Sequence, residues 1–338
     1  MNTTKHVNTT LEIIKLLASY MVVFIHIHFD GHAGIVIDAL ARFAVPLFFL
    51  ISGFYSYQIT PEKVLKRIKN VLFLIVLGVV SYTLFNLFLM LLWKSPQDIL
   101  LYFVKYCDIG VWFKLIFMNF TVSSGHLWYL FAILYVYIIF YFVTKHCLRE
   151  NFIYISAFVL LFVNILLGEG LSAFGIVFDH MNARNFALMG IPFFEIGLLV
   201  RKHENKVKKI PGYVSVFAAA IGILGSIASL NLWGEKELYL GSVFILFAII
   251  IIFVKYSDIQ YPHILYQSIG FSTYIYIFHI MVNTAVMICY SKLNIDMEQS
   301  AILRNLHPLI VCAASTVVSY CIVRILKAVP AKKVERRD

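Results

Sequence analysis

Apolar runs long enough to cross a lipid bilayer follow one another from one end of this 338-residue chain to the other. A transmembrane helix needs about 20 predominantly apolar residues, because the hydrocarbon layer is about 30 Å thick. Hydrophobic residues make up 61% of the chain and charged residues only 14%, which excludes an ordinary water-soluble globular domain. The sequence therefore predicts an all-α polytopic integral membrane protein, with a single transmembrane domain over residues 1–338.

The apolar runs between charge clusters predict about ten spans. They begin near Leu11, Ala39, Val71, His126, Phe152, Arg184, Gly212, Leu238, Gly270 and Pro308. With the N-terminus inside, the inner connectors hold 19 Lys and Arg residues and the outer connectors 6. Because cytoplasmic loops collect Lys and Arg, both termini are predicted to be cytoplasmic. The net charge of +10 then reflects topology and contact with anionic lipid headgroups, so no nucleic-acid partner is expected.

Two segments outside the predicted spans have their own character. The connector 93–125 lies outside in this topology and contains two apolar pieces, Ile99–Tyr106 and Val111–Phe120, each too short to span. Segments of this kind lie in the membrane interface or re-enter between helices, so we predict a long external amphipathic loop. Residues 329–338 are rich in Lys and Arg and are predicted to form a basic cytoplasmic tail.

Ionisable residues near the outer ends of four predicted spans mark a candidate site. An ionisable group within an apolar run is costly, and it is therefore a functional-site hypothesis. The first run, Leu11–Phe29, ends with His26 and His28, and Arg42 lies at the outer start of the second span. The fourth and sixth spans add His126, Trp128 and Arg184 at the same face. Together these groups predict a polar cavity open to the outside.

Spacing sets limits on what the two histidines can do. His26 and His28 would point about 200° apart on a helix, so we expect only one of them to face such a cavity. Helical metal ligands need a spacing of three or four residues, and no metal site is predicted. For His279, in the predicted ninth span, we expect a core histidine bonded to a backbone carbonyl.

For the other polar positions, a simple structural role is the alternative to a functional one. Arg42 follows Asp38 by four residues, and an ion pair between them is the alternative to a substrate contact. Glu12 and Lys15, near the inner end of the first span, are spaced to pair on one helix face. Gly53, after Ser52, is expected to allow close helix packing.

Several motifs, in this order along the chain, resemble the membrane-bound acyltransferase 3 family of bacterial envelope O-acyltransferases. The motifs are Glu12-x-x-Lys15 followed by His26, the segment Arg42–Phe54, Gly125–Leu130, Phe193-Phe194-x-x-Gly197 and Tyr274–His279. The resemblance covers nearly the whole chain and implies ten spans. It also implies transfer of an acyl group, usually acetyl, from cytoplasmic acyl-CoA to a hydroxyl or amine of a glycan or other envelope molecule.

The resemblance assigns roles to individual residues. His26 matches the family's essential histidine of the first span and Arg42 its essential arginine of the second. We predict His26 as general base and Arg42 as a contact to the donor or the oxyanion, chemistry that suits both side chains. The predicted substrate- or donor-binding residues are Lys15, Glu12, His126, Trp128, Arg184 and His28. Lys15 stands where the family more often has arginine, and a lysine cannot grip a phosphate bidentately.

These assignments define the expected partners. No bound cofactor is predicted, and acyl-CoA, with acetyl-CoA the expected form, is a co-substrate. Membrane lipids and a glycan or envelope acceptor are the other expected partners, at the bacterial plasma membrane, and assembly into a homo-oligomer stays open. Direct transfer is favoured because no serine or cysteine lies beside His26 in the sequence. The alternative is a small-molecule transporter of the same fold, carrying an amino acid such as serine or a glycan intermediate.

Overall fold

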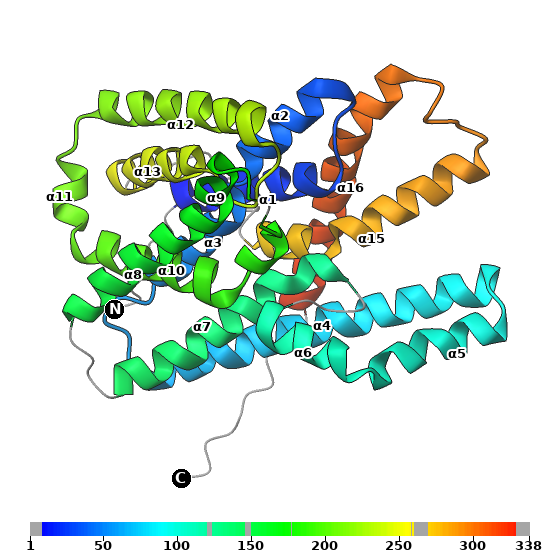
Figure 1. The fold of residues 1–338 in the computed structure, drawn as a ribbon. Helices are drawn as coiled ribbons and strands as arrows, with labels where there is room; N and C mark the ends of the chain where they lie inside the picture. The colour runs from blue at the N-terminus through cyan, green and yellow to red at the C-terminus, as the bar shows by residue number, and fades with distance from the viewer. Residues whose placement is uncertain are drawn as a thin grey trace, which may run out of the picture. The chain divides into compact units, whose positions relative to one another are not determined.

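The computed structural model describes residues 9–119, 124–145, 150–176, 178–257, 259 and 270–328. Every regular element in these stretches is a helix (Figure 1). The chain divides into two compact units: unit 1 comprises Met1–Gly34 and Ser257–Asp338, and unit 2 comprises Ile35–Tyr256. The predicted all-α class is therefore confirmed.

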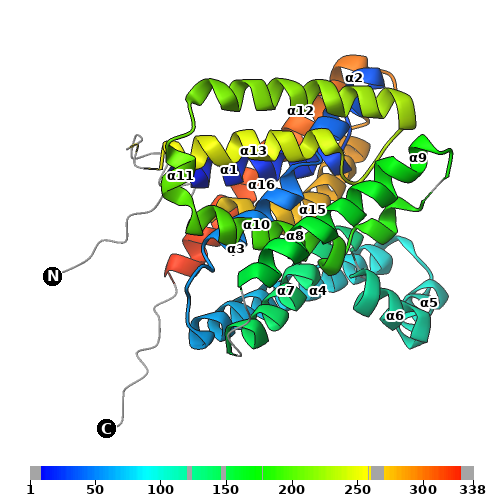
Figure 2. The same ribbon diagram turned by 60° about the vertical axis from the view of Figure 1, so that its left-hand side comes forward.

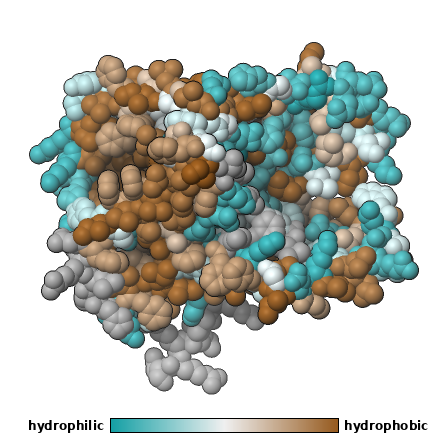
Figure 3. All heavy atoms as spheres, in the orientation of Figure 1, coloured by the Kyte–Doolittle hydropathy of each residue, from teal (hydrophilic) through white to brown (hydrophobic). Residues whose placement is uncertain are grey.

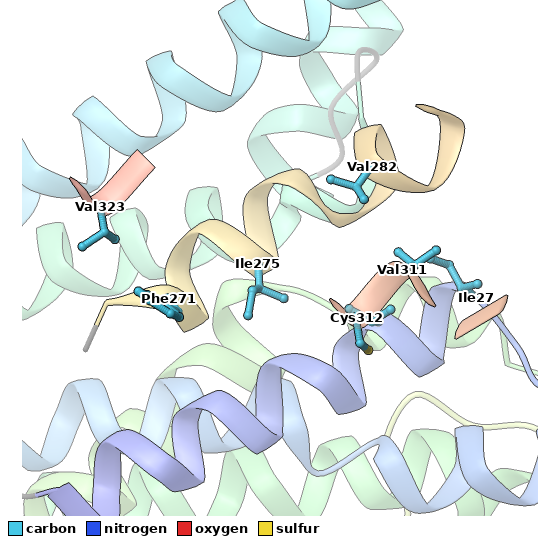
Figure 4. Close-up of a cluster of buried hydrophobic side chains, with 8 residues drawn as sticks. Ile27, Phe271, Ile275, Val282, Val311, Cys312 and Val323 are labelled. Atoms are coloured by element: carbon cyan, nitrogen blue, oxygen red, sulfur yellow. The ribbon is translucent and has the colours of Figure 1, made fainter. Parts of the chain in front are cut away.

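Unit 1 is built around three long helices from the two ends of the sequence. They are α1 (Thr9–His26), α15 (Phe271–Lys292) and α16 (Ala301–Ala328). Helix α15 packs against both α1 and α16. Figure 4 shows the apolar core between them, where Ile27, Val311 and Cys312 lie close together and Ile275 projects from α15. A hydrogen bond of 2.8 Å between the hydroxyls of Tyr20 and Thr316 links α1 to α16.

Unit 2 contains the remaining helices. The first of them, α2, begins at Gly31 and therefore crosses the boundary along the chain between Gly34 of unit 1 and Ile35 of unit 2. The α-helices are α2 (Gly31–Ala41), α3 (Ala44–Phe54), α4 (Pro61–Trp93), α5 (Pro96–Val104), α6 (Ile109–Met118), α7 (Trp128–Lys145), α8 (Glu150–Ile165), α9 (Leu171–Ala173), α10 (Ile191–Lys202), α11 (Glu204–Lys208), α12 (Gly212–Trp233) and α13 (Leu240–Lys255). Short 3₁₀ turns are η1 (Lys105–Cys107), η2 (Gly125–Leu127) and η4 (His180–Ala183), and η3 (Leu166–Gly170) and η5 (Phe186–Gly190) are π-helical.

Close helix pairs hold unit 2 together. In Figures 1 and 2, α12 lies along α13 and α4 lies along α7, and α3 packs against α10. A Cβ at Gly53 would lie 1.8 Å from the carbonyl oxygen of Phe194, and one at Gly197 would lie 2.0 Å from that of Leu50. Only glycine allows the two backbones to approach this closely, so the predicted packing role of Gly53 is confirmed.

Eight helical segments are long and apolar enough to cross a membrane. They are Thr9–His26, Gly31–Phe54, Pro61–Trp93, Gly125–Lys145, Phe152–Ala173, Gly212–Trp233, Phe271–Lys292 and Ala301–Ala328. The other two predicted spans correspond to shorter helices: α13, of 16 residues, and η5 followed by α10, of 5 and 12 residues. The protein is therefore a polytopic membrane protein, whereas the count of ten and the cytoplasmic termini stay predictions.

The surface of unit 2 suits contact with lipid tails. Figure 3 shows hydrophobic side chains gathered over the region of α8 and α13. Phe158 on α8 is 73% exposed and Leu224 on α12 is 68% exposed. In water, such side chains would favour aggregation, but in a bilayer they face acyl chains.

The predicted external loop forms two short helices. Helices α5 and α6 occupy most of it and are joined by η1. The side chains of Ser95 and Asp98 form a capping box at the start of α5, and this box satisfies backbone N–H groups at the helix end. The large side chains of Ile109 and Trp112 are exposed, as expected of helices that lie in an interface. Residues 120–123 and the predicted basic tail, 329–338, lie outside the described residues.

Candidate active site

His26 is the last residue of α1, and this end of the helix corrects one expectation. The first span was predicted to continue as a helix to Phe29, but α1 ends at His26 and the chain turns before α2 begins at Gly31, whose φ of 69° favours glycine. The helical argument that separated His26 from His28 was therefore wrong, because His28 lies beyond the helix. The structure separates them by burial instead, with His26 half-buried and His28 exposed.

His26 is paired with a second histidine within unit 1. Its ring stacks on that of His279 from α15, with a centroid distance of 5.3 Å and an interplanar angle of 30°. Nδ1 of His279 lies 2.9 Å from the carbonyl oxygen of Tyr276 and 3.1 Å from that of Ile275. Carbonyl oxygens only accept, so Nδ1 of His279 carries the proton and Nε2 is the basic nitrogen of the neutral ring. The predicted carbonyl bond of His279 is confirmed; its stacking on His26 was not predicted.

Glu12 and Lys15 form the predicted ion pair at the start of α1. The Lys15 ammonium lies 2.8 Å from Oε1 of Glu12, and both side chains are largely buried. Since Glu12 occupies one of the three ammonium donors, the remaining donors of Lys15 are the ones that a donor phosphate would have to use.

Arg42, in unit 2, lies at a break between two helices. Helix α2 ends at Ala41 and α3 begins at Ala44, so the predicted start of the second span, near Ala39, lies in the last turn of α2. Pro46 explains the break. In a continuous helix the N–H of residue 46 would bond to the carbonyl of Arg42, and proline has no N–H.

Two carboxylates hold the Arg42 guanidinium. Nε and Nη2 donate to Oδ2 of Asp38 at 3.0 and 2.7 Å, and Nη1 donates to Oε2 of Glu237 at 3.0 Å. The side chains of Arg42, Asp38 and Glu237 are 12%, 4% and 10% exposed. The predicted ion pair with Asp38 is confirmed, and Glu237 is a second partner that sequence reasoning missed.

Arg184 and Trp128 complete this cluster. The second oxygen of Glu237, Oε1, lies 3.5 Å from Nη1 of Arg184, and the Arg184 guanidinium lies over the Trp128 ring at 5.5 Å. Trp128 is buried at the start of α7. The structure thus brings the predicted residues Arg42 and Arg184 together around one carboxylate, with Trp128 packed against Arg184. His126, another residue predicted at this face, is buried and packs edge-on against the ring of Tyr82, with a centroid distance of 5.1 Å.

The family comparison gives this arrangement its context. The model of the acyltransferase 3 family, described as an acyltransferase domain, matches residues 8–324. The chain belongs to this family. Searches of curated proteins and of solved structures gave no match. The matched range includes His26, Arg42 and every residue of the two clusters above, so the protein is a membrane acyltransferase whose histidine pair and arginine pair lie inside the family domain.

The acyltransferase holds Glu237 on a braced connector between α12 and α13. The Tyr239 hydroxyl accepts a hydrogen bond of 3.0 Å from the Lys236 N–H and donates to the carbonyl of Gly234 at 3.4 Å. Burial raises the pKa of Tyr239 to about 12, so the phenol stays neutral and can donate. One sequence signal for Glu237 existed: it is an acidic residue in a short connector at the predicted outer face.

Sequence reasoning also missed Arg67 of α4, which binds the C-terminal end of α3. Its Nη1 lies 2.7 Å from Oγ of Ser56 and 3.2 Å from the carbonyl of Ser52, and its Nη2 lies 2.5 Å from the carbonyl of Tyr55. The last carbonyls of a helix lack intrahelical donors and carry partial negative charge, so a guanidinium there stabilises the helix end. Arg67 thereby fixes the end of the helix that begins beside Arg42.

No three His, Cys, Asp or Glu side chains converge as metal ligands in the part of the chain that the structure describes.

Proposed function

We propose that this acyltransferase transfers an acyl group, acetyl in the simplest case, from cytoplasmic acyl-CoA to a hydroxyl of an extracytoplasmic glycan or other envelope molecule in the bacterial plasma membrane. The observation that carries the proposal is the family match over residues 8–324, because it spans both clusters of ionisable side chains. The proposal gives His26 the role of general base and makes acyl-CoA the co-substrate.

The surroundings of His26 support this role. His26 is half-buried at the end of α1, and its ring stacks on that of His279. In the proposed step, His26 takes the proton of the acceptor hydroxyl as its oxygen attacks the thioester carbonyl. The tetrahedral oxyanion then collapses, the carbon–sulfur bond breaks, and the coenzyme A thiolate takes the proton from the imidazolium. The acceptor gains the acyl group and coenzyme A leaves as the thiol.

The arginine cluster supports a second role, stabilisation of negative charge. A guanidinium has five N–H donors, and Asp38 and Glu237 engage three of those of Arg42. A fixed cation with remaining donors, in a site from which water is largely excluded, suits a phosphate or an oxyanion. Lys15 with Glu12, together with His126 and Trp128, are proposed as contacts to the donor or the acceptor, as is the exposed His28.

The test is acyl transfer by membrane vesicles that contain the full chain, with acetyl-CoA as donor and mass spectrometry of the envelope glycans as readout. His26→Ala is expected to lower the transfer rate by at least about a hundredfold, since general acid–base catalysis contributes factors of that order. His32→Ala is the matched control because this nearby histidine is exposed and has no proposed role; the variant should transfer at a rate close to that of the wild type. Wild-type rates in His26→Ala membranes, at equal protein level, would contradict the role of His26.

The break between α2 and α3 favours a second candidate, transport of a small molecule. Discontinuous helices line the binding sites of many transporters, and Arg42 lies in the break between α2 and α3. Accumulation of serine or of a glycan intermediate in vesicles without any acyl donor would support transport. The absence of such accumulation, combined with acyl transfer, would support the enzyme.

A further inference from the structure

Glu237 bridges two arginines that come from distant parts of the sequence. Its Oε2 lies 3.0 Å from Arg42 and its Oε1 lies 3.5 Å from Arg184, so each oxygen serves one guanidinium. A carboxylate and a phosphate both present at least two oxygens in this way, and arginine binds either of them with its planar fork. The side chain of Glu237 therefore occupies the position that an anionic ligand of the two arginines would take.

The charges around Glu237 make this position suitable for an anion. Asp38 binds Nε and Nη2 of Arg42, and this pair is neutral by itself. Arg184 then adds one positive charge, which Glu237 compensates in the described part of the chain. If the Glu237 side chain moved away, the cluster would carry a net charge of +1 in a nearly buried site, where an uncompensated charge is costly. A ligand with an oxyanion would restore neutrality.

Arg42, Arg184 and Glu237 also differ in the contacts that would remain if the cluster opened. Arg42 is fixed by Asp38 and Arg184 lies over the Trp128 ring, so both cations keep a second contact when Glu237 is removed. Glu237 lies instead on the connector between α12 and α13, just after Gly234, whose φ of 72° marks a turn. Each cation therefore keeps a partner when Glu237 moves away, Asp38 for Arg42 and Trp128 for Arg184, whereas the anion lies on the connector between α12 and α13.

We propose that Arg42 and Arg184 form a binding site for an oxyanion of a substrate, a phosphate or a carboxylate, and that Glu237 exchanges with this group. The inference deepens the proposed function and rests on it in one respect, since it assigns the anion to the acyl donor or to the acceptor. It gives Glu237 a positioning role: this side chain keeps the two guanidinium groups together and sets the affinity of the site.

The test measures binding to the detergent-solubilised full chain and needs no acyl transfer. The probe is inorganic diphosphate, and its affinity is measured by thermal stabilisation of the protein and by calorimetry. Glu237→Gln should tighten diphosphate binding about tenfold, because the neutral amide no longer competes for the arginines. Glu235→Gln, two residues earlier on the same connector and exposed, is the matched control and should bind as the wild type does.

A second variant keeps the proposal falsifiable if Glu237→Gln fails to fold. Arg184→Gln/Glu237→Gln removes one charge of each sign and leaves the Arg42–Asp38 pair, so it should fold and should lose diphosphate binding at least about tenfold relative to the wild type. Unchanged binding in this double variant would overturn the proposal, as would a well-folded Glu237→Gln protein that binds diphosphate no more tightly than Glu235→Gln does.

Competition identifies the source of the anion. Displacement of diphosphate by coenzyme A assigns the site to the donor, and displacement by glucuronate assigns it to an acidic acceptor. If neither competes, the site does not serve a substrate and the proposal fails. Because these measurements record binding alone, a protein that binds the anion but transfers no acyl group would contradict the proposed function while leaving the anion site intact.

Discussion

The two clusters of ionisable groups in this protein differ in how their polar side chains are stabilised when buried. In unit 1, His26 and His279 place imidazoles among apolar helices, and His279 satisfies its Nδ1–H with backbone carbonyls. In unit 2, Arg42 and Arg184 keep full charges and are compensated by carboxylates. A neutral imidazole can be buried with one hydrogen bond, whereas a buried guanidinium needs an anion.

This difference assigns different chemistry to the two clusters. An imidazole can take up and release a proton, which is the property that a general base needs. Guanidinium groups held by carboxylates cannot accept protons but can bind or stabilise negative charge. Proton transfer is therefore expected to depend on unit 1, and anion binding on unit 2.

The largest expected effect comes from removing the cation of the charged cluster. Arg42→Ala leaves the carboxylates of Asp38 and Glu237 buried without their shared partner, and breaking a buried ion pair in this way costs about 3–5 kcal/mol. Thermal unfolding in detergent should show a large loss of stability together with loss of activity. Arg42→Lys restores the charge but not the fork and should recover part of the stability. An Arg42→Ala protein as stable as the wild type would show that the two carboxylates do not depend on this arginine.

The histidine pair should respond in the opposite way, with a larger effect on activity than on stability. His279→Phe keeps an aromatic ring of similar size against His26 but removes the Nδ1–H and the basic Nε2. Because a well-packed apolar ring replaces a buried polar one, we expect little change in thermal stability and a fall in the transfer rate of about tenfold or more. The comparison of the clusters is wrong if His279→Phe unfolds the protein while leaving the rate per folded molecule unchanged.

Arg67 tests how much a guanidinium contributes to stability when it binds backbone carbonyls and a hydroxyl instead of carboxylates. Arg67→Ala removes the hydrogen bonds to the end of α3, and Arg67→Lys keeps the charge near those carbonyls. The loss of helix-end stabilisation should cost about 1–2 kcal/mol in the alanine variant and less in the lysine variant, as measured by thermal unfolding. Equal destabilisation by both variants would show that the fork geometry, and not the charge, holds the helix end.

The smallest expected effect is at Lys15. Lys15→Arg places a bidentate donor beside Glu12 and should lower the KM for acetyl-CoA by a factor of about 2–5, with kcat nearly unchanged, if this position contacts a phosphate. Lys63→Arg, on the exposed start of α4, is the control and should leave both constants as in the wild type. An unchanged KM in Lys15→Arg would remove Lys15 from the donor site.

Much of the fold was predictable because a bilayer tolerates few solutions. Apolar runs of spanning length must be helical, since lipid offers no partners for backbone N–H and C=O groups. The two spans that came out short, α13 and η5 with α10, show that apolar character predicts a helix but not its length. The end of α1 at His26 was missed because apolar residues continue to Phe29, and hydropathy alone does not show where a helix ends within such a run.

The cations of the candidate site and one of their partners, Asp38, could be predicted from the sequence, whereas the second partner, Glu237, could not. Arg42, Arg184 and Trp128 were found because charged and aromatic residues at span ends are conspicuous. Glu237 was missed because a single acid in a connector normally faces water, and only the fold places it between two arginines. The contact of His26 with His279 joins the two ends of the chain, a separation over which no sequence pattern operates.

The most direct test follows an acyl group across the membrane. Sealed vesicles are prepared with ¹³C-acetyl-CoA confined to the side that faces the cytoplasm and with an envelope glycan acceptor outside, and the glycan is analysed by mass spectrometry. Labelled acetyl is expected on the external glycan with the wild-type chain, and at least about a hundredfold less of it with His26→Ala. Equal labelling by the two proteins, at matched amounts in the membrane, would contradict the central role of His26.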